Sequence, residues 1–240
     1  MSNKTAGWFF LLNFSITGLS AAVPEERIAG TYHDLSPRNY TGTMNNEICA
    51  FCHTPHASNS YFSGAPLWNK GNPLRTSFTL YGATAPDTPG TTIAGTQTAN
   101  TLNPASAICL SCHDGVSGIN SVVNMPGSGK YAATGQYVEY AGNYTPVNLT
   151  GTFAVGQGGD LTNDHPISIP YRGNEANPPA GLRQTNYPLV DWVGASTVGD
   201  LLRNGYVECG SCHNPHVRSI AFLKVTSSSG SKICIACHDK

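Results

Sequence analysis

All eight cysteines of this 240-residue chain occur in four copies of the spacing C-x-x-C, and a histidine follows each copy directly. C-x-x-C-H is the attachment motif of haem c, in which both thiols form thioethers with the porphyrin. The predicted thioether residues are Cys49, Cys52, Cys109, Cys112, Cys209, Cys212, Cys234 and Cys237. The predicted proximal iron ligands are His53, His113, His213 and His238. The sequence thus predicts four covalently bound haem c groups.

Cysteine pairs of this spacing also occur in zinc sites and in disulfide scaffolds. Either alternative would use the cysteines but would leave the four histidines at the same offset without a role. A single motif could arise by chance, whereas these four use every cysteine of the chain. We therefore interpret the cysteines as haem attachment sites.

Four further histidines bring the total to eight, the number that four haems with two axial histidines each require. The predicted distal ligands are His33, His56, His165 and His216. Histidine on both sides of the iron leaves no coordination position for a substrate, which favours electron transfer over catalysis. Met44 and Met125 are the alternative axial ligands, but the histidines suffice, and we expect both methionines to pack.

Two of the distal candidates belong to the longer motif C-H-x-P-H, which pairs His53 with His56 and His213 with His216. Side chains three residues apart lie close together, so the second histidine cannot reach the far side of its own iron. Each must therefore ligate a different haem or none, and one that ligates a different haem would hold two haems in close contact. We expect His56 to serve the Cys109 site and His216 to serve a haem near the C-terminal pair of motifs.

The composition indicates how little conventional core the chain can build. Charged residues make up 11% of the chain, against about 25% in typical globular domains. The 26 glycines and 16 prolines favour turns over long helices. A formal net charge of −1 excludes a general nucleic-acid binder, which needs a strong basic excess. We expect a multihaem cytochrome c fold that is mostly coil and loop, organised around a stacked haem array.

Regular elements are expected to be short. Helices are expected at each C-x-x-C-H site, and one more over Asp191–Asn204, where apolar residues recur at helical spacing before Gly205. Short strands are expected over Gln136–Tyr140 and Val147–Val155, and a short strand or a turn over Ile220–Val225. Because a haem stack would run through any internal boundary, residues 23–240 are expected to form a single tetrahaem domain.

Residues 1–22 are typical of an export signal. Lys4 supplies a positive charge, an apolar stretch runs from Ala6 to Leu19, and the small residues of 20–22 suit cleavage. The stretch is too short and too polar for a transmembrane anchor. Because haem c is attached outside the cytoplasm, we expect a protein that is secreted to the cell surface, or a periplasmic one if it is a soluble carrier.

The export signal, the four motifs, the clamps Cys49–His56 and Cys209–His216, and His165-Pro166-Ile167 together resemble a known family. The chain is similar to the multihaem c-type cytochromes that polymerise into extracellular electron-conducting filaments, most of all the tetrahaem OmcE-type nanowire subunits. The resemblance implies bis-histidine haems, a homopolymer with head-to-tail contacts, and external electron acceptors. In that family an axial histidine of one subunit can ligate a haem of the next, which makes His33 the candidate for the cross-subunit ligand.

Three functions are consistent with these features. The favoured one is a filament subunit for long-range electron transport, because a weakly charged surface suits permanent subunit contacts. The second is a monomeric periplasmic tetrahaem carrier between a quinol oxidase and a terminal reductase. The third is a multihaem reductase, which the histidine count disfavours because an enzyme needs one open iron position. We therefore expect no catalytic residue in this chain.

Overall fold

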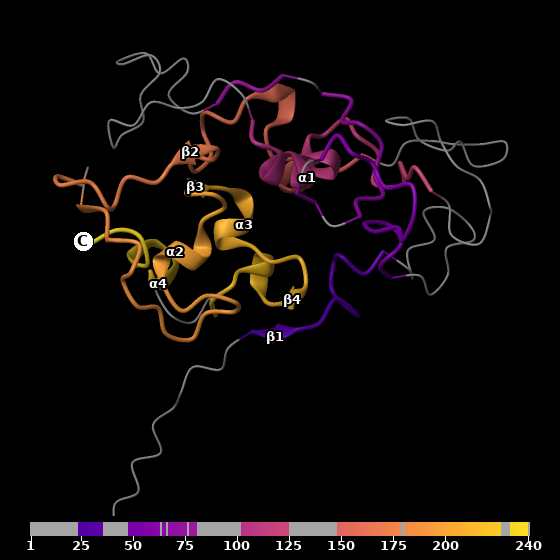
Figure 1. Cartoon of the computed structure of the whole chain (residues 1–240). Helices are drawn as coiled ribbons and strands as arrows, with labels where there is room; N and C mark the ends of the chain where they lie inside the picture. The colour runs from indigo at the N-terminus through magenta and orange to yellow at the C-terminus, as the bar shows by residue number, and fades with distance from the viewer. Residues whose placement is uncertain are drawn as a thin grey trace, which may run out of the picture.

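The computed structural model describes residues 24–35, 48–62, 64–65, 67–75, 77–80, 102–124, 148–178, 181–226 and 231–239. Most of these residues lie in turns and loops, as Figure 1 shows, which confirms the expected coil-rich chain with short helices and small sheets. The helices are α1 (Pro104–His113), α2 (Val198–Leu201), α3 (Cys209–Cys212) and α4 (Lys232–Ile235), with 3-10 turns η2 (Gly151–Phe153), η3 (Gln157–Gly159) and η5 (Ile220–Phe222). The strands are β1 (Glu25–Glu26), β2 (Ile169–Pro170), β3 (Tyr206–Val207) and β4 (Val217–Arg218).

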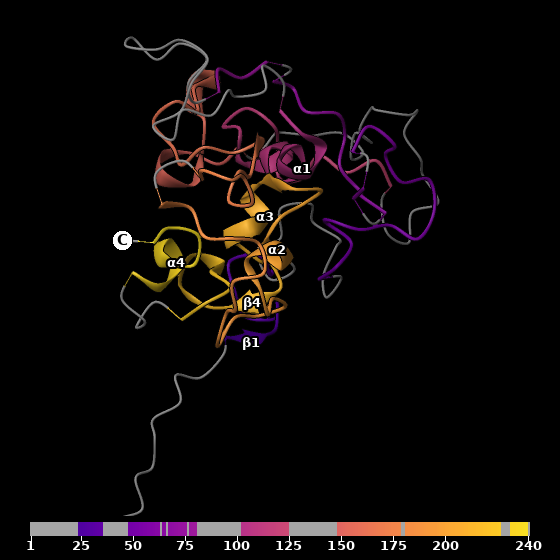
Figure 2. The ribbon, with the colours of Figure 1, turned by 60° about the vertical axis from the view of Figure 1, so that its left-hand side comes forward.

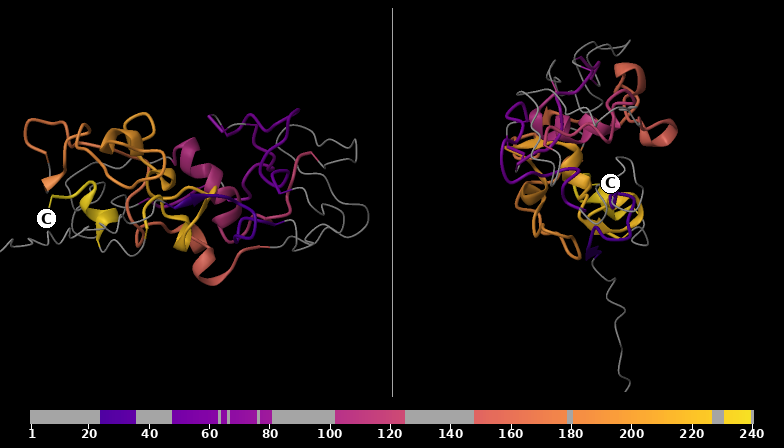
Figure 3. Two further views of the ribbon diagram at one scale, coloured as in Figure 1. Left: turned by 90° about the horizontal axis from the view of Figure 1, so that it is seen from below. Right: turned by 90° about the vertical axis from the view of Figure 1, so that its right-hand side faces the viewer.

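Helix α1 is the longest element and lies between the loops of residues 48–80 and the C-terminal part of the chain, as the left panel of Figure 3 shows. Pro104 occupies the first turn, where its missing N–H costs no hydrogen bond. The helix stops after His113, because Gly115 takes a left-handed backbone with φ of +76°. Helix α3 lies against α1, as Figure 2 shows, so the second and third motifs are neighbours in space.

Two small antiparallel sheets tie distant parts of the chain together. In the first, Glu25 pairs with Arg218 and Glu26 with Val217, so β1 lies beside β4 in Figures 1 and 2. In the second, β2 pairs with β3 just before the third motif. The β1–β4 pair carries the N-terminal segment, and with it His33, to the residues that follow the third motif.

Helix formation at the C-x-x-C-H sites is confirmed for three of the four motifs, which lie in α1, α3 and α4. The first motif forms a single turn over residues 48–52. Asp191–Asn204 is helical only over α2, because the turn at Asn204-Gly205 and the left-handed Gly194 interrupt the pattern. Residues 148–155 contain the 3-10 turn η2 instead of the expected strand. Residues 220–225 contain the 3-10 turn η5, so the turn and not the strand forms there.

Several sequence predictions fall outside the described residues: the export signal, the strand at Gln136–Tyr140, and the two methionines Met44 and Met125. Within the ranges that the structure describes, no helix is both long enough and apolar enough to cross a membrane.

The buried apolar side chains form three separate clusters instead of one continuous core. The first joins Phe51 and Val122, the second joins Leu80, Leu110 and Leu161, and the third surrounds Trp192. Each cluster includes one residue of a C-x-x-C-H motif. These residues are Phe51 of the first motif, Leu110 of the second motif and Ala236 of the fourth motif. Each cluster therefore anchors a motif, while other apolar residues, such as Phe62 and Val217, are buried outside the clusters.

Asn69 fixes the loop that carries the first motif. Its side-chain amide donates to the carbonyls of Ala50 (2.6 Å) and Asn124 (2.9 Å), and its Oδ1 accepts from the Asn124 N–H (2.9 Å). Its backbone N–H donates to the Cys52 carbonyl at 2.8 Å. Because the side chain is almost fully buried, each of these bonds replaces water that cannot enter.

We expect Asn69→Ala to lower the free energy of unfolding by about 2–4 kcal/mol, since buried donors and acceptors lose their partners. Thermal or denaturant unfolding of the haem-loaded protein measures the change. The exposed Asn186 makes no side-chain hydrogen bond in the described structure, so Asn186→Ala should stay within about 0.5 kcal/mol of the wild type. Equal effects of the two substitutions would show that the Asn69 network does not hold the loop.

Candidate metal centres

The first motif closes through its own backbone. The N–H groups of Cys52 and His53 both donate to the Cys49 carbonyl, at 3.1 and 2.8 Å, which forms one tight turn. Burial, with a smaller contribution from Cys112, raises the pKa of the Cys52 thiol to about 12, and Lys70 opposes the shift. The thiol is therefore protonated and is not poised to bind a metal ion as thiolate.

The second and third motifs meet where α1 contacts α3. The Cys109 and Cys209 side chains are hydrogen-bonded, and this contact, followed by burial, raises the pKa of Cys109 well above its usual range. The Cys209 N–H also donates to Ser106 Oγ of α1 at 3.1 Å. These bonds fix the two attachment sites against each other.

The fourth motif lies close to the third. Burial, then the neighbouring Cys212, raises the pKa of Cys237 to about 11, while a hydrogen bond with Tyr171 opposes the shift. Burial, with a smaller contribution from Cys234, raises the pKa of Cys212. Since Cys52 faces Cys112 in the same way, the four attachment sites succeed one another through space in the order of the sequence.

All eight cysteines are described, and none forms a disulfide. Among the described residues, no group of three histidine, cysteine or acidic side chains converges as a zinc site requires. The structure thus offers no support for the disulfide and zinc alternatives.

The histidine rings form two close pairs. The rings of His53 and His216 have centres 6.3 Å apart and planes inclined by 15°, and those of His33 and His113 have centres 6.1 Å apart and planes at 85°. Two metal–imidazole bonds of about 2 Å each, together with the half-widths of the rings, separate ring centres by about 6 Å. Each pair therefore joins one proximal histidine to one distal candidate at a spacing that suits a single iron.

Hydrogen bonds at Nδ1 orient two of the proximal histidine rings. His113 Nδ1 lies 2.7 Å from the Phe153 carbonyl, and His213 Nδ1 lies 2.7 Å from the Ala221 carbonyl. A carbonyl can only accept, so Nδ1 carries the proton and Nε2 keeps its lone pair free. This tautomer is the one that a metal-binding histidine with a second partner adopts.

His33 is the most buried of the distal candidates. Burial, followed by the nearby His113 and His216, lowers the pKa of its imidazole to about 4, although the Pro215 carbonyl raises it. Its Nδ1 is buried without a hydrogen bond of good geometry, and the Phe222 ring lies 4.0 Å from its own ring. The ring is therefore neutral near pH 7, which is the state that binds a metal.

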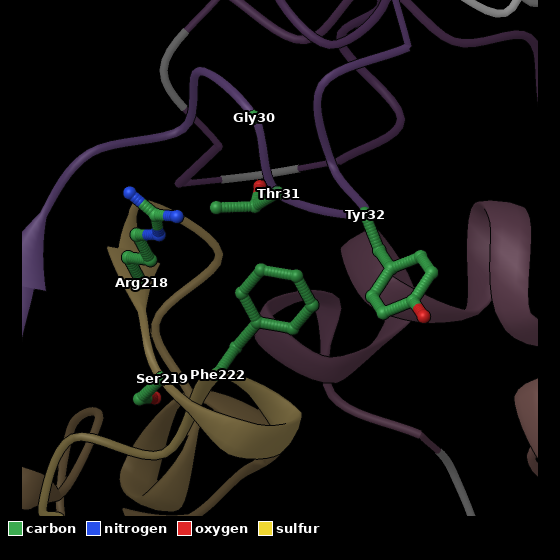
Figure 4. A pocket seen from close by; sticks show the side chains of 6 residues that line it. All are labelled: Gly30, Thr31, Tyr32, Arg218, Ser219 and Phe222. Carbon is green, nitrogen blue, oxygen red and sulfur yellow. The ribbon is translucent and has the colours of Figure 1, made fainter.

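A pocket of about 330 Å³ adjoins the His33 segment. Figure 4 shows Tyr32 and Phe222 turned toward it and Arg218 at its edge. One cationic side chain, Arg218, lines the pocket, and the lining Phe222 contacts the His33 ring. The two ring spacings and the free Nε2 atom of His113 fit an iron with two axial histidines.

These pairs differ from the partners expected from the sequence. His216 lies with His53 instead of serving the C-terminal motifs, and His33 lies with His113 of its own chain, at the site expected for His56. The cause is the β1–β4 pair, which sequence spacing does not reveal. The structure brings neither His56 nor His165 to another histidine ring; both are exposed, and His165 Nδ1 lies 3.0 Å from the Pro166 carbonyl. Their assignment as distal ligands stays a prediction.

Comparison with known proteins adds independent information on the C-terminal part of the chain. Residues 202–240 match the family model described as the doubled CXXCH motif. This pair of motifs implies covalently bound haem c, as in c-type cytochromes that transfer electrons. No curated protein matches the chain.

Three buried charged residues near the attachment sites belong to no recognisable sequence motif, so they were not identified from the sequence. Lys70 lies near Cys52, Glu208 directly precedes the third motif, and Asp114 directly follows the second. Only the position of the two acidic residues beside a C-x-x-C-H could have drawn attention to them. Their burial becomes visible only in the fold.

Proposed function

We propose that this protein is an electron-transfer protein that carries four haem c groups, each with two axial histidines and without an enzymatic site. The pairing of His53 with His216 and of His33 with His113 is the observation that carries the proposal. A pair of imidazoles on one iron leaves no place for a substrate, so the iron can only exchange electrons. His56 and His165 are the remaining candidates for the sites of His213 and His238.

The chain itself supplies attachment, orientation and spacing. The cysteine pairs hold each group covalently, and the carbonyls of Phe153 and Ala221 orient the His113 and His213 rings. When bound, haem c supplies a one-electron iron couple whose potential the protein sets. The contact of α1 with α3 keeps two attachment sites together, as stepwise transfer requires.

Carbon monoxide tests this closed coordination. Because both axial positions are predicted to be occupied, we expect the optical spectrum of the dithionite-reduced protein to stay unchanged when carbon monoxide is added. A carbon monoxide adduct at one of the four haems would contradict the proposal and would support the multihaem reductase instead. Free haem in detergent provides the positive control for the gas.

We further propose that the protein is exported and polymerises head to tail into an extracellular filament that passes electrons to external acceptors. Two properties support it: only 11% of residues are charged, and large apolar side chains are exposed. Ile220 is 71% exposed, Tyr32 70% and Val190 67%. We propose that these side chains take part in contacts with another chain, which would cover their apolar surface. Such contacts need no shared ligand from His33, which is paired within its own chain.

Negative-stain electron microscopy of the secreted protein tests the filament. We expect continuous thin filaments whose subunits carry haem. Monodisperse particles of one chain, at a concentration well above that in the culture medium, would contradict polymerisation and support the periplasmic carrier.

A further inference from the structure

Lys70 carries a positive charge into the interior beside the first attachment site. Its side chain is 1% exposed, and its Nζ donates to the carbonyls of Gly118 (3.2 Å) and Ile119 (2.5 Å). Lys70 lowers the pKa of the Cys52 thiol, against the larger effect of burial, which raises it. The neighbouring Asn69 N–H donates to the Cys52 carbonyl. In the part of the chain that the structure describes, Lys70 forms no ion pair. Burying an ammonium without a carboxylate costs free energy, which indicates a role beyond packing.

Two buried carboxyl groups border the second attachment site, and one of them, Glu208, lies between this site and the third. Glu208 is 2% exposed and accepts hydrogen bonds from Asn103 Nδ2 (2.7 Å), Ser168 Oγ (3.2 Å) and Ser106 Oγ. Asp114 is fully buried and accepts from the N–H groups of Val116 (2.9 Å) and Ser117 (2.6 Å), and from Ser117 Oγ (2.6 Å). All these partners are neutral donors, and among the described residues neither carboxyl group forms an ion pair.

From this arrangement we infer that Lys70, against Glu208 and Asp114, sets the order of reduction potentials along the haem row. A buried cation stabilises the electron-rich, reduced iron nearby and raises its potential, whereas a buried anion lowers it. The Cys49/Cys52 site thus has the highest midpoint potential of the four, and the Cys109/Cys112 site has the lowest. An electron in the row rests most often at the first site. This inference depends on the proposed function, because it presupposes bound haem.

Apart from the buried Asp34 beside His33, which adds a carboxyl group to the second site, the other charges near the row are compensated or screened. Glu26 lies near His216 at the first site, but its carboxyl group is exposed, so water screens its charge. At the third site, the positive charge of Lys224 lies near Cys212 and opposes the effect of Glu208. At the fourth site the charges occur as ion pairs, with Arg183 bound to Asp239 and Lys232 bound to Asp191. The first two sites therefore mark the extremes.

Optical potentiometric titration of the haem-loaded protein tests the inference. We expect Lys70→Met to shift the highest of the four midpoints to lower potential and to leave the lowest in place. Glu208→Gln and Asp114→Asn keep the shape of the side chain and remove its charge, so each should shift the lowest midpoint upward. The exposed Glu175, which pairs with Arg172, provides the matched control: Glu175→Gln should leave all four midpoints unchanged.

Unchanged midpoints, shifts of the opposite sign, or equal shifts in the Glu175→Gln control would overturn the inference. If Lys70→Met yields no haem-loaded protein, the two isosteric carboxylate substitutions decide alone, and Lys70→Arg should retain the highest midpoint. Haem content and the low-spin optical spectrum are recorded on the same samples. Absence of haem c, or high-spin iron in the wild type, would contradict the proposed function; loaded low-spin haems with unmoved midpoints would contradict only the charge effect.

Discussion

Replacement of His216 by alanine should convert one haem of four from low spin to high spin, because the ring that pairs with His53 is removed. The Cys49/Cys52 site would then have one histidine and an open position for water or carbon monoxide. His33→Ala should have the same effect at the Cys109/Cys112 site, because His33 pairs with His113. The double substitution should yield two high-spin haems. Electron paramagnetic resonance of the oxidised protein counts them.

The inclination of the ring planes separates the two sites in the same spectrum. Nearly parallel axial imidazoles, such as His53 and His216 at 15°, give an ordinary rhombic low-spin signal. Nearly perpendicular imidazoles, such as His33 and His113 at 85°, give a highly anisotropic low-spin signal. His216→Ala should therefore reduce the rhombic signal, and His33→Ala should reduce the anisotropic one.

Two controls show that the effect comes from the lost ligand and not from misfolding. Added imidazole should restore low-spin iron in His216→Ala. His216→Met should stay low-spin and raise the midpoint of that haem, because a thioether ligand favours the reduced state. A fully low-spin spectrum in both alanine variants would refute the pairs seen in the structure.

A chain produced without haem attachment should lack a cooperative unfolding transition. The three apolar clusters contain only two, four and three buried residues, and they are not joined to one another. Such clusters cannot offset the conformational entropy of a chain that is mostly coil. The bound porphyrins would supply the missing apolar surface. The loss should therefore affect the whole domain.

Expression without the haem attachment machinery supplies the test protein, and circular dichroism with limited proteolysis measures its order. The haem-loaded protein is the reference and should melt in one transition and resist the protease. A sharp thermal transition and the same protection in the haem-free chain would show that the polypeptide folds on its own. In that case the haems would bind to a polypeptide that is already folded.

The sequence predicts the chemistry of the sites but not which histidines lie together. The C-x-x-C-H motifs and the matching number of histidines are local or compositional signals, so they can be read directly. The pairing of His33 with His113 depends on β1 finding β4 across nearly two hundred residues, and each strand has only two residues. Strands this short carry no periodicity from which their register could be predicted.

The sequence-based errors in local structure have the same kind of cause. The helix expected over 191–204 ends early because Asn204 and Gly205 both adopt left-handed backbone and close a hairpin between Arg203 and Tyr206. Asn-Gly is a strong hairpin signal that outweighs the helical spacing of the preceding apolar residues. The burial of Lys70 could not be predicted, because a single lysine between polar residues is typical of an exposed position.

The intact mass of the purified protein tests the central claim most directly. We predict one species whose mass exceeds that of the polypeptide by four haem groups, with no thiol left for alkylation. A species with fewer haems, or a haem-free chain whose cysteines are free, zinc-bound or joined as disulfides, would contradict the account of four haem centres on this chain.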